Sequence, residues 1–459
     1  MSINTKAIDS AFFADKKHLH FIGVGGSGMF PLVQIFLSKG FHISGSDNNE
    51  SDTLAQERAM GVTVYMGHAA ENIAGADAIV YSAAIMQDNA ELAAARAAGI
   101  PIIERAVLLG YVSRQYNTCV CVCGTHGKTS STGMLTQILL TAGLDPTAVI
   151  GGKLPLMGGS GRAGQSQIMT CEACEFVDTF LELAPDIAVI LNIDADHLDY
   201  FKTMDNLKAS FRKFAAMASK TLIVNGDDPN TMEVIAGLPQ PVITFGFAPT
   251  NDYYPADITP LSPVGSRFAL MHKGAKVTDI ELNVIGRHNI LNATAACIAA
   301  LEAGATPEQL APGLVDFRGT GRRFEVLGQV NGITIADDYA HHPTELTATL
   351  NAAMELDFKQ VWAVFQPFTY SRTAMLLEEF AQALAIPHKV VMSEIMGARE
   401  HNTYNIYTKD LADKIPGSVW FNTFEEIAAY VLAHAQPGDL VITMGCGDIY
   451  KCAKLMLGK

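Results

Sequence analysis

A chain of 459 residues is too long for one hydrophobic core and has the length of about three domains of roughly 150 residues each. With 49% hydrophobic and 17% charged residues, its composition is typical of a soluble globular protein. The formal net charge of -15, without clusters of Lys and Arg, excludes a nucleic-acid-binding surface but leaves small phosphorylated ligands possible.

The cysteines and the N-terminal segment indicate the compartment. Cys119, Cys121 and Cys123 alternate along one apparent strand, and most of the other cysteines lie in apolar stretches, as in a protein with reduced thiols. The N-terminal segment carries acidic residues and no apolar core of signal-peptide length, and no run of about 18 apolar residues follows it. We therefore expect a cytoplasmic protein without membrane insertion, present as a monomer or a homodimer.

The order of the predicted elements indicates three α/β domains in series. In the first domain, residues 1–115, we expect strands at 18–24, 41–46, 62–67, 78–84 and 100–105. In the second, residues 116–320, we expect strands at 117–124, 167–172, 187–194, 220–226 and 241–247, then an antiparallel hairpin at 266–286 and a helix closed by Gly304. In the third, residues 321–459, we expect strands at 332–338, 360–366, 389–395, 418–422 and 439–445. Because strands that alternate with helices form parallel sheets, the first and third domains are predicted to be Rossmann-like.

A glycine-rich turn follows the first predicted strand. Gly23, Gly25 and Gly28 have the spacing G-x-G-x-x-G, and Asp47 closes the second strand. This context favours a nucleotide diphosphate at a helix N-terminus, with a carboxylate for a ribose hydroxyl. A glycine-rich turn without a ligand is the alternative.

A phosphate-binding loop opens the second domain. Gly124, Gly127, Lys128 and Thr129 lie between its first strand and first helix, although Val122 stands where the usual loop has its first glycine. Backbone amides would hold phosphates, Lys128 would reach the terminal phosphates, and Thr129 could bind magnesium. The pattern predicts a P-loop ATPase-like central domain.

Ionisable side chains follow several later strands. We expect those at the ends of the second-domain strands to lie beside the loop, where oxygen donors and one imidazole suit Mg²⁺ or Mn²⁺; they are Glu172, Glu175, Asn192, Asp194, Asp196 and His197. His288, Asn289 and Asn292 begin a helix and could either cap it or contact a base. In the third domain, Arg322 and Arg323 could stabilise a transferring phosphoryl group, and Arg372 could clamp a carboxylate. A further cluster of ionisable side chains follows a strand of this domain and consists of Asp337, Asp338, Tyr339, His341, His342 and Glu345.

These sites together limit the reaction. A hydride-transfer enzyme would leave the second site unexplained, and a nucleotide switch would leave the first unexplained. An enzyme that uses ATP to activate a nucleotide-linked substrate employs both, with the third domain closing on a carboxylate-bearing second substrate.

The chain resembles the Mur ligase family of peptidoglycan synthesis along all three expected domains. The resemblance rests on the ordered motifs HFIGVGGSGM, SGSD, GTHGKTSST, NIDADHLDYF, GRHNILNATAA, RRFE, DDYAHHPTE and FQPFTYSRT, of which the first and DDYAHHPTE favour the member that adds the first amino acid. It implies that ATP phosphorylates the lactyl carboxylate of UDP-N-acetylmuramate to an acyl phosphate. The amine of L-alanine then attacks, and ADP and phosphate are released.

The resemblance also implies roles for individual residues. ATP would be bound by Gly124, Thr125, His126, Gly127, Lys128, Thr129, Ser130, His288, Asn289, Asn292 and Arg323. The UDP-linked substrate would be bound by Gly23, Gly25, Gly26, Gly28, Met29, Ser46, Asp47, Ser82, His126, Tyr339 and His341. The metal ligands would be Thr129, Glu172 and His197, the amino-acid carboxylate would meet Arg372, and catalysis would depend on Lys128, His197, Arg323 and His341.

Departures from the family leave alternatives open. Phe368 and Thr369 stand where the family often has His and Arg, so Arg372 lacks a basic partner and glycine or serine competes with L-alanine. The family's EADESD reads EACEFVD here, so Glu172 carries over better than Glu175. A ligase that recycles a preformed peptide, a non-catalytic nucleotide-binding regulator and an NAD dehydrogenase remain as other functions.

Overall fold

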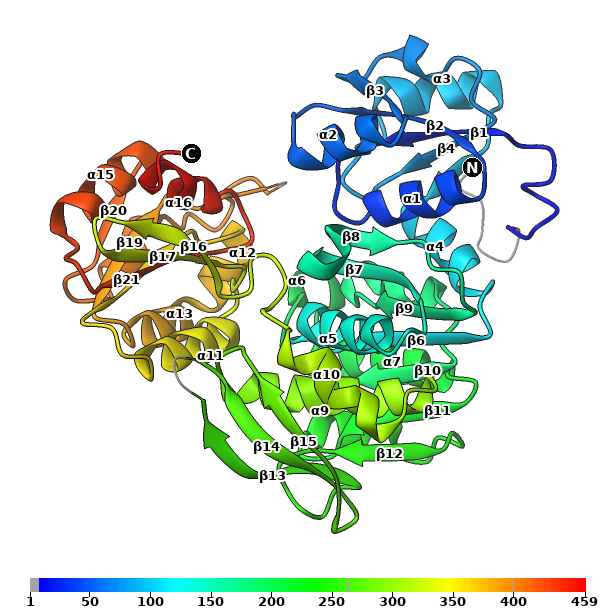
Figure 1. Ribbon diagram of the computed structural model, residues 1–459. Helices are drawn as coiled ribbons and strands as arrows, with labels where there is room; N and C mark the ends of the chain where they lie inside the picture. Colours follow the sequence, from blue (N-terminus) through cyan, green and yellow to red (C-terminus); the bar gives the residue numbers. More distant parts are fainter. Residues whose placement is uncertain (1–7, 262–263, 399) are drawn as a thin grey trace.

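The computed structural model describes residues 8–261, 264–398 and 400–459, which form three β-sheets in series, each covered by helices (Figure 1). This arrangement confirms the predicted α/β class. Within the described residues, no helix is long and apolar enough to cross a membrane.

The first sheet is fully parallel, with the strand order β3-β2-β1-β4-β5. Its strands are β1 (His18–Ile22), β2 (His42–Asp47), β3 (Thr63–Met66), β4 (Ala78–Tyr81) and β5 (Ile102–Glu104). Its helices are α1 (Phe30–Ser38), α2 (Asp52–Ala59), the 3-10 helix η2 (Ala70–Ile73), α3 (Ala90–Ala98) and α4 (Arg105–Ser113). The side chains of Ser51 and Asn89 cap α2 and α3, and Gly99 ends α3 in the left-handed conformation, so short-range signals fix these boundaries.

The central sheet has the strand order β15-β14-β13-β12-β11-β10-β6-β9-β7-β8. Its strands are β6 (Thr118–Cys123), β7 (Thr147–Leu154), β8 (Gly159–Arg162), β9 (Ile168–Glu172), β10 (Ile187–Ile190), β11 (Thr221–Asn225), β12 (Val242–Phe245), β13 (Tyr253–Pro260), β14 (Ser266–His272) and β15 (Ala275–Leu282). Its helices are α5 (Lys128–Thr141), η3 (Pro155–Met157), η4 (Phe176–Glu182), α6 (Leu198–Phe201), α7 (Met204–Ala216), α8 (Pro229–Ile235), α9 (Arg287–Glu302) and α10 (Pro307–Val315). The expected antiparallel hairpin is β14 and β15, whereas β7, β8 and β13 were not predicted.

The middle of the central sheet is buried on both faces. Along β6, Cys119, Cys121 and Cys123 pack into one apolar cluster, while Val120 and Val122 pack into another on the opposite face. All five are at most 1% exposed, and every cysteine in the protein is free. The alternation of cysteine and valine therefore reflects a strand covered by helices on both sides.

The third sheet has the strand order β16-β17-β21-β18-β19-β20, and only the unpredicted edge strand β16 pairs antiparallel within it. Its strands are β16 (Glu325–Val330), β17 (Ile333–Asp338), β18 (Val361–Phe365), β19 (Lys389–Ser393), β20 (Val419–Phe421) and β21 (Leu440–Met444). Its helices are α11 (Pro343–Met354), α12 (Tyr370–Met375), α13 (Leu377–Leu384), α14 (Thr408–Ala412), α15 (Phe424–His434) and α16 (Tyr450–Met456).

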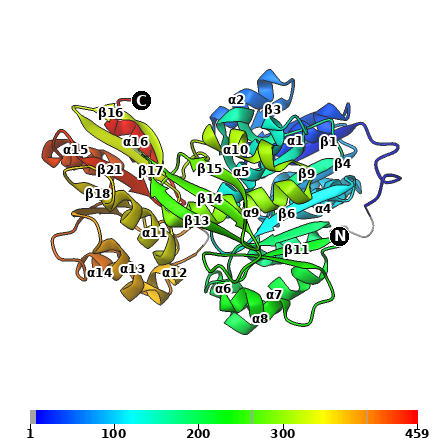
Figure 2. The same ribbon diagram turned by 60° about the horizontal axis from the view of Figure 1, so that its bottom comes forward.

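The first and third domains contact different parts of the central domain. Helix α1 packs against β7 and β8, which places the first sheet at that edge (Figure 1). Two views show the third sheet on the other side, with α11 beside β13 and β14 (Figures 1 and 2). The central domain is therefore flanked by two seams, where residues from separate domains can meet.

Candidate functional site at the domain seams

A cavity of about 820 Å³ lies where the central and third domains meet. It is lined by residues of the phosphate-binding loop, the ends of β10 and β11, and the beginnings of α9 and α11. Seven of the residues expected to bind ATP line it: His126, Gly127, Ser130, His288, Asn289, Asn292 and Arg323. A cavity of this size can hold a nucleotide, and both apolar and polar side chains line it.

Two glycines shape the phosphate-binding loop. Gly124 and Gly127 have φ values of 140° and 88°, which disfavour other residues. A Cβ atom on Gly127 would lie 2.5 Å from Oδ1 of Asn292, and one on Gly124 would lie 2.9 Å from Cβ of Leu191. The loop thus lies directly against the start of α9 and the end of β10. Since Val122 belongs to buried β6, the functional loop begins at Gly124.

Lys128 begins α5, and its positive charge is paired with a carboxylate. Its Nζ donates to the carbonyl oxygens of Gly124 and Thr125 at 2.6 and 3.0 Å, and to Oε1 of Glu175 at 3.0 Å. Burial opposes the ammonium charge, but the carboxylate of Glu175 outweighs it and raises the pKa of Lys128 above its ordinary value. Lys128 is therefore charged and held at the base of the loop.

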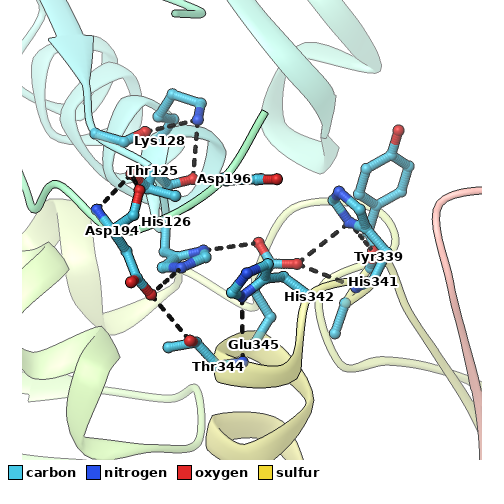
Figure 3. A network of polar contacts seen from close by, with 12 residues as sticks. Thr125, His126, Lys128, Asp194, Asp196, Tyr339, His341, His342, Thr344 and Glu345 are labelled. Atoms are coloured by element: carbon cyan, nitrogen blue, oxygen red, sulfur yellow. Dashed lines mark hydrogen bonds and ion pairs between the residues drawn. The ribbon is translucent and has the colours of Figure 1, made fainter. Parts of the chain in front are cut away.

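His126 bridges the central and third domains (Figure 3). Its Nε2 lies 3.2 Å from Oδ2 of Asp194, and its Nδ1 lies 3.3 Å from Oε1 of Glu345 on α11. Burial alone would lower the pKa of His126, but these two carboxylates raise it to about 9. The hydroxyl of Thr344 also donates to Asp194, at 2.9 Å. A charged imidazolium thus joins the phosphate-binding loop to the third domain.

Glu345 lies close to several groups on its own side of this seam. The backbone N–H of His341 donates to it at 3.1 Å, His341 Nδ1 lies 3.2 Å away, and Arg323 approaches to 3.9 Å. Burial would raise the pKa of Glu345, but His341 and His126 hold it well below the ordinary range. Glu345 is therefore ionised and contacts residues of both domains. The sequence placed it in a charged cluster without assigning it a role.

Two of the residues expected to bind a metal ion, Glu172 and Thr129, lie beside β7, whereas the third, His197, has its Nε2 3.9 Å from Oε1 of Glu175. The backbone N–H of Gly151 on β7 donates to Glu172 at 2.7 Å, and a Cβ on the next residue, Gly152, would lie 3.0 Å from Cγ2 of Thr129. Glu172 and Thr129 are thus held against consecutive residues of one strand. Burial lowers the pKa of His197, which favours the neutral imidazole that binds metals. A carboxylate, a hydroxyl and an imidazole form a donor set that fits Mg²⁺ or Mn²⁺.

A different cluster also has the spacing of metal ligands. In the part of the chain that the structure describes, His126, Asp194 and His342 place ligand atoms within 4.8 Å of one another. Metal binding would need a neutral His126. Because the pKa of His126 is raised to about 9, its ion pairs with Asp194 and Glu345 account for this arrangement without a metal.

A second cavity of about 260 Å³ contains Arg372, expected at the amino-acid carboxylate, together with two residues expected to bind the UDP-linked substrate. Tyr339, His341 and Arg372 line it together with Phe368 and Cys446. An ion pair joins Arg372 to the central domain, since its NH2 lies 3.0 Å from Oδ1 of Asp196. The guanidinium is therefore already placed at the seam.

Arg322 has a different position from its neighbour Arg323. Its guanidinium donates to Asp337 at 2.8 Å and to the carbonyl oxygens of Gly445 and Gly447 at 2.7 and 3.2 Å. These bonds join the start of the third domain to the ends of β17 and β21. The sequence-based hypothesis that Arg322 faces phosphoryl charge is wrong, because its donors are used within the third domain.

The glycine-rich turn of the first domain has the predicted geometry. The backbone N–H of Gly25 donates to Oδ2 of Asp47 at 3.1 Å, and a Cβ on Gly23 would lie 3.5 Å from the hydroxyl of Ser82. Ser46 is fully buried and donates to Glu91 at 2.6 Å. The remaining expected residues of this site, Gly26, Gly28 and Met29, lie in the same turn before α1.

Known protein families match nearly the whole chain. Residues 18–117 match the model of the "Mur ligase family, catalytic domain", residues 122–300 the "Mur ligase middle domain", and residues 322–447 the "Mur ligase, glutamate ligase domain". Among curated proteins, the UDP-N-acetylmuramate–L-alanine ligase of Agathobacter rectalis is 43% identical over 97% of this chain and 99% of its own length. The protein of the same name from Acetivibrio thermocellus is 42% identical over 96% of both chains.

Solved structures show the same fold. UDP-N-acetylmuramate-alanine ligase from Thermotoga maritima has a TM-score of 0.82 at 24% identity, covering 96% of this chain and 98% of that one. A murein peptide ligase from Psychrobacter arcticus has a TM-score of 0.75 with the same identity and coverage. On the full-length similarity to the curated relatives, the chain belongs to the Mur ligase family.

Proposed function

We propose that the protein joins L-alanine to the lactyl carboxylate of UDP-N-acetylmuramate, with ATP converted to ADP and phosphate. The observation that carries this proposal is the seam cavity, where a phosphate-binding loop with a charged Lys128 meets Arg323 of the third domain. The names and full-length similarity of the curated relatives support the choice of substrates.

The proposed reaction has two chemical steps. A lactyl carboxylate oxygen attacks the γ-phosphorus of ATP, ADP leaves, and an acyl phosphate forms. The neutral amine of alanine then attacks the acyl carbon, and the tetrahedral intermediate loses a proton and phosphate to leave the amide. Carboxylate and triphosphate repel each other, so Lys128 and Arg323 stabilise the negative charge as it moves between them.

The metal ion and ATP have assigned positions in this proposal. The adenosine end occupies the large cavity beside Asn289 and Asn292, and the phosphates lie on the loop. Thr129, Glu172 and His197 would hold Mg²⁺ or Mn²⁺, which supplies further neutralisation of phosphate charge when bound. The protein's own contribution is to hold Thr129 and Glu172 against β7.

The two remaining substrates occupy the outer domains. We assign the UDP part of the muramoyl substrate to residues 1–115, ATP to 116–320 and the amino acid to 321–459. Arg372 binds the carboxylate of alanine in the smaller cavity, while His341 and Tyr339 face the reacting end of the muramoyl group. Phe368 in the wall of this cavity favours a small apolar side chain, and therefore L-alanine over serine.

Phosphate release tests the proposal. The protein is incubated with ATP, Mg²⁺, UDP-N-acetylmuramate and, in separate reactions, L-alanine, glycine, L-serine or a free tripeptide. The tripeptide used is free L-alanyl-γ-D-glutamyl-meso-diaminopimelate, whose amino group can be joined to the lactyl carboxylate. We expect release that requires both UDP-N-acetylmuramate and L-alanine. Release only with the tripeptide would instead identify a recycling ligase, and nucleotide binding without any release would identify a non-catalytic regulator.

A further inference from the structure

We propose that Arg105 binds the diphosphate of the nucleotide-linked substrate, in a cavity between the first and central domains. This assignment rests on the proposed function for the identity of the full substrate. It adds a side chain to a glycine-rich turn that would otherwise bind phosphate through backbone groups alone. Arg105 would set affinity and position, and it would take no part in the bond-making steps.

The cavity connects the glycine-rich turn to the catalytic region. It measures about 270 Å³ and is lined by Ser27, Gly28 and Arg105 from the first domain and by Gly151 and Glu172 from the central domain. One end therefore lies at the turn expected to hold a diphosphate, and the other lies at a carboxylate expected to hold the metal. A substrate with its diphosphate on the turn and its lactyl group near ATP has to pass through this space.

Arg105 lies directly over the turn. It is the first residue of α4, after β5, and its NH1 and Cδ atoms are both 3.3 Å from the position that a Cβ on Gly28 would take. The absence of a side chain at Gly28 lets the guanidinium approach the backbone this closely. The third glycine of the motif thus makes room for an arginine as well as for a ligand.

The guanidinium of Arg105 has no protein partner among the described residues. Every other arginine of the first domain has at least one. Arg58 pairs with Glu50 at 2.7 Å, and Arg96 donates to the backbone oxygen of Gln87 at 2.8 Å. An unpaired, half-buried guanidinium in a concave site suits a phosphate group, because its planar donors can bind two phosphate oxygens together.

The charges at the two ends of the cavity favour the diphosphate over the lactyl carboxylate. Glu172 places a carboxylate at the far end, where it repels an anion unless a metal ion intervenes. Arg105 is at the end shared with Ser27 and Gly28. Since the lactyl carboxylate has to reach the ATP phosphates near Lys128, the anion beside Gly28 is the diphosphate.

Binding and kinetics of Arg105→Ala test this assignment. We expect the Kd for UDP-N-acetylmuramate, measured by calorimetry, to rise about 10- to 100-fold, the usual cost of a lost charge-assisted hydrogen bond. The KM for this substrate should rise by a similar factor, while kcat at saturation and the KM for ATP change less than about threefold. Arg105→Lys should recover part of the affinity. Arg96→Ala, at an exposed arginine of the same domain, is the matched control and should leave all four quantities unchanged.

Two further measurements locate the contact. The Kd for UDP, which has the diphosphate but no lactyl group, should rise in parallel with that for the full substrate, and Gly28→Ala should weaken UDP binding by displacing the guanidinium. An unchanged UDP affinity in Arg105→Ala would overturn the assignment, and a loss restricted to UDP-N-acetylmuramate would move the contact to the lactyl carboxylate. If the wild-type protein shows no turnover, the proposed function fails, whereas the UDP affinities still decide the role of Arg105.

Discussion

Replacement of Glu57 on α2 by glutamine should stabilise the protein at neutral pH. The side chain is fully buried, and neither carboxyl oxygen has a hydrogen-bond partner among the described residues. Burial, and then the negative charge of Asp47, raise the pKa of Glu57 from 4.5 to about 8. The folded protein therefore keeps a proton that the unfolded chain releases, so stability is lost as the pH rises from 4.5 toward 8.

The size of this effect follows from the two pKa values. At about 1.4 kcal/mol for each pKa unit, ionisation of Glu57 in the unfolded chain costs about 3 kcal/mol of folding free energy at pH 7. The cost reaches about 5 kcal/mol above pH 9, where the full difference between the two pKa values applies. Glutamine has nearly the same shape and no ionisation, so Glu57→Gln should remove the dependence on pH.

Urea unfolding followed by circular dichroism measures this prediction. The free energy of unfolding of Glu57→Gln should match that of the wild type near pH 4.5 and exceed it by about 3 kcal/mol at pH 7. Glu71→Gln, at an exposed position of the same domain, is the control and should show no such difference. A gap between Glu57→Gln and wild type that stays constant from about pH 5 to pH 9 would refute the reasoning.

Three other variants test the phosphate-binding loop, the His126 bridge and the start of the third domain. Lys128→Ala should reduce phosphate release by at least about 10³-fold through lost charge stabilisation while leaving the Kd for UDP-N-acetylmuramate within about threefold, and an equal loss of both would contradict the separation of two sites. The ion pair between the imidazolium of His126 and Glu345 should be intact below pH 6.5 and should be lost as the pH rises through about 9. Small-angle scattering should therefore show an increase in the radius of gyration over that range in the wild type, and already at pH 7 in His126→Ala. Equal radii of gyration for the two proteins at pH 7 would count against the bridge. Arg322→Ala leaves Asp337, which is 1% exposed, without its cation, and should cost about 3 to 5 kcal/mol in tryptophan-monitored unfolding of the third domain, whereas a loss below about 1 kcal/mol would exclude a structural role.

The buried parallel strands were predictable because each is a short apolar run that ends in a turn signal. The strands that escaped prediction lack such a run. β8 has the sequence GSGR, and a Cβ on its Gly161 would lie 2.4 Å from Cα of Pro31 in α1. Its glycines therefore allow close contact between two domains, and no local sequence pattern predicts that contact. β16 pairs at a sheet edge with few buried side chains, so its hydrophobic signal is weak.

The same distinction applies to the site. The phosphate-binding loop and the polar strand ends could be identified, because their chemistry is carried by neighbouring residues. The partners of those residues could not, since His126 and Glu345 are separated by 219 residues and Asp196 and Arg372 by 176. Such pairs depend on how the domains close against each other, which sequence spacing does not encode. Arg322 and Arg323 show most clearly what sequence alone cannot predict. They are adjacent in the chain, but Arg322 is bonded within the third domain and Arg323 lines the cavity at the seam.

The tether between Lys128 and Glu175 makes ATP binding an exchange of one anion for another. Glu175 occupies the ammonium group at 3.0 Å, so a phosphate that takes Lys128 displaces a buried carboxylate. That carboxylate also lies 3.9 Å from Nε2 of His197. A phosphate at Lys128 would thus leave the negative charge of Glu175 close to His197. The carboxylate of Glu175 thus holds the position beside Lys128 that a phosphate would take, and it lies within reach of His197.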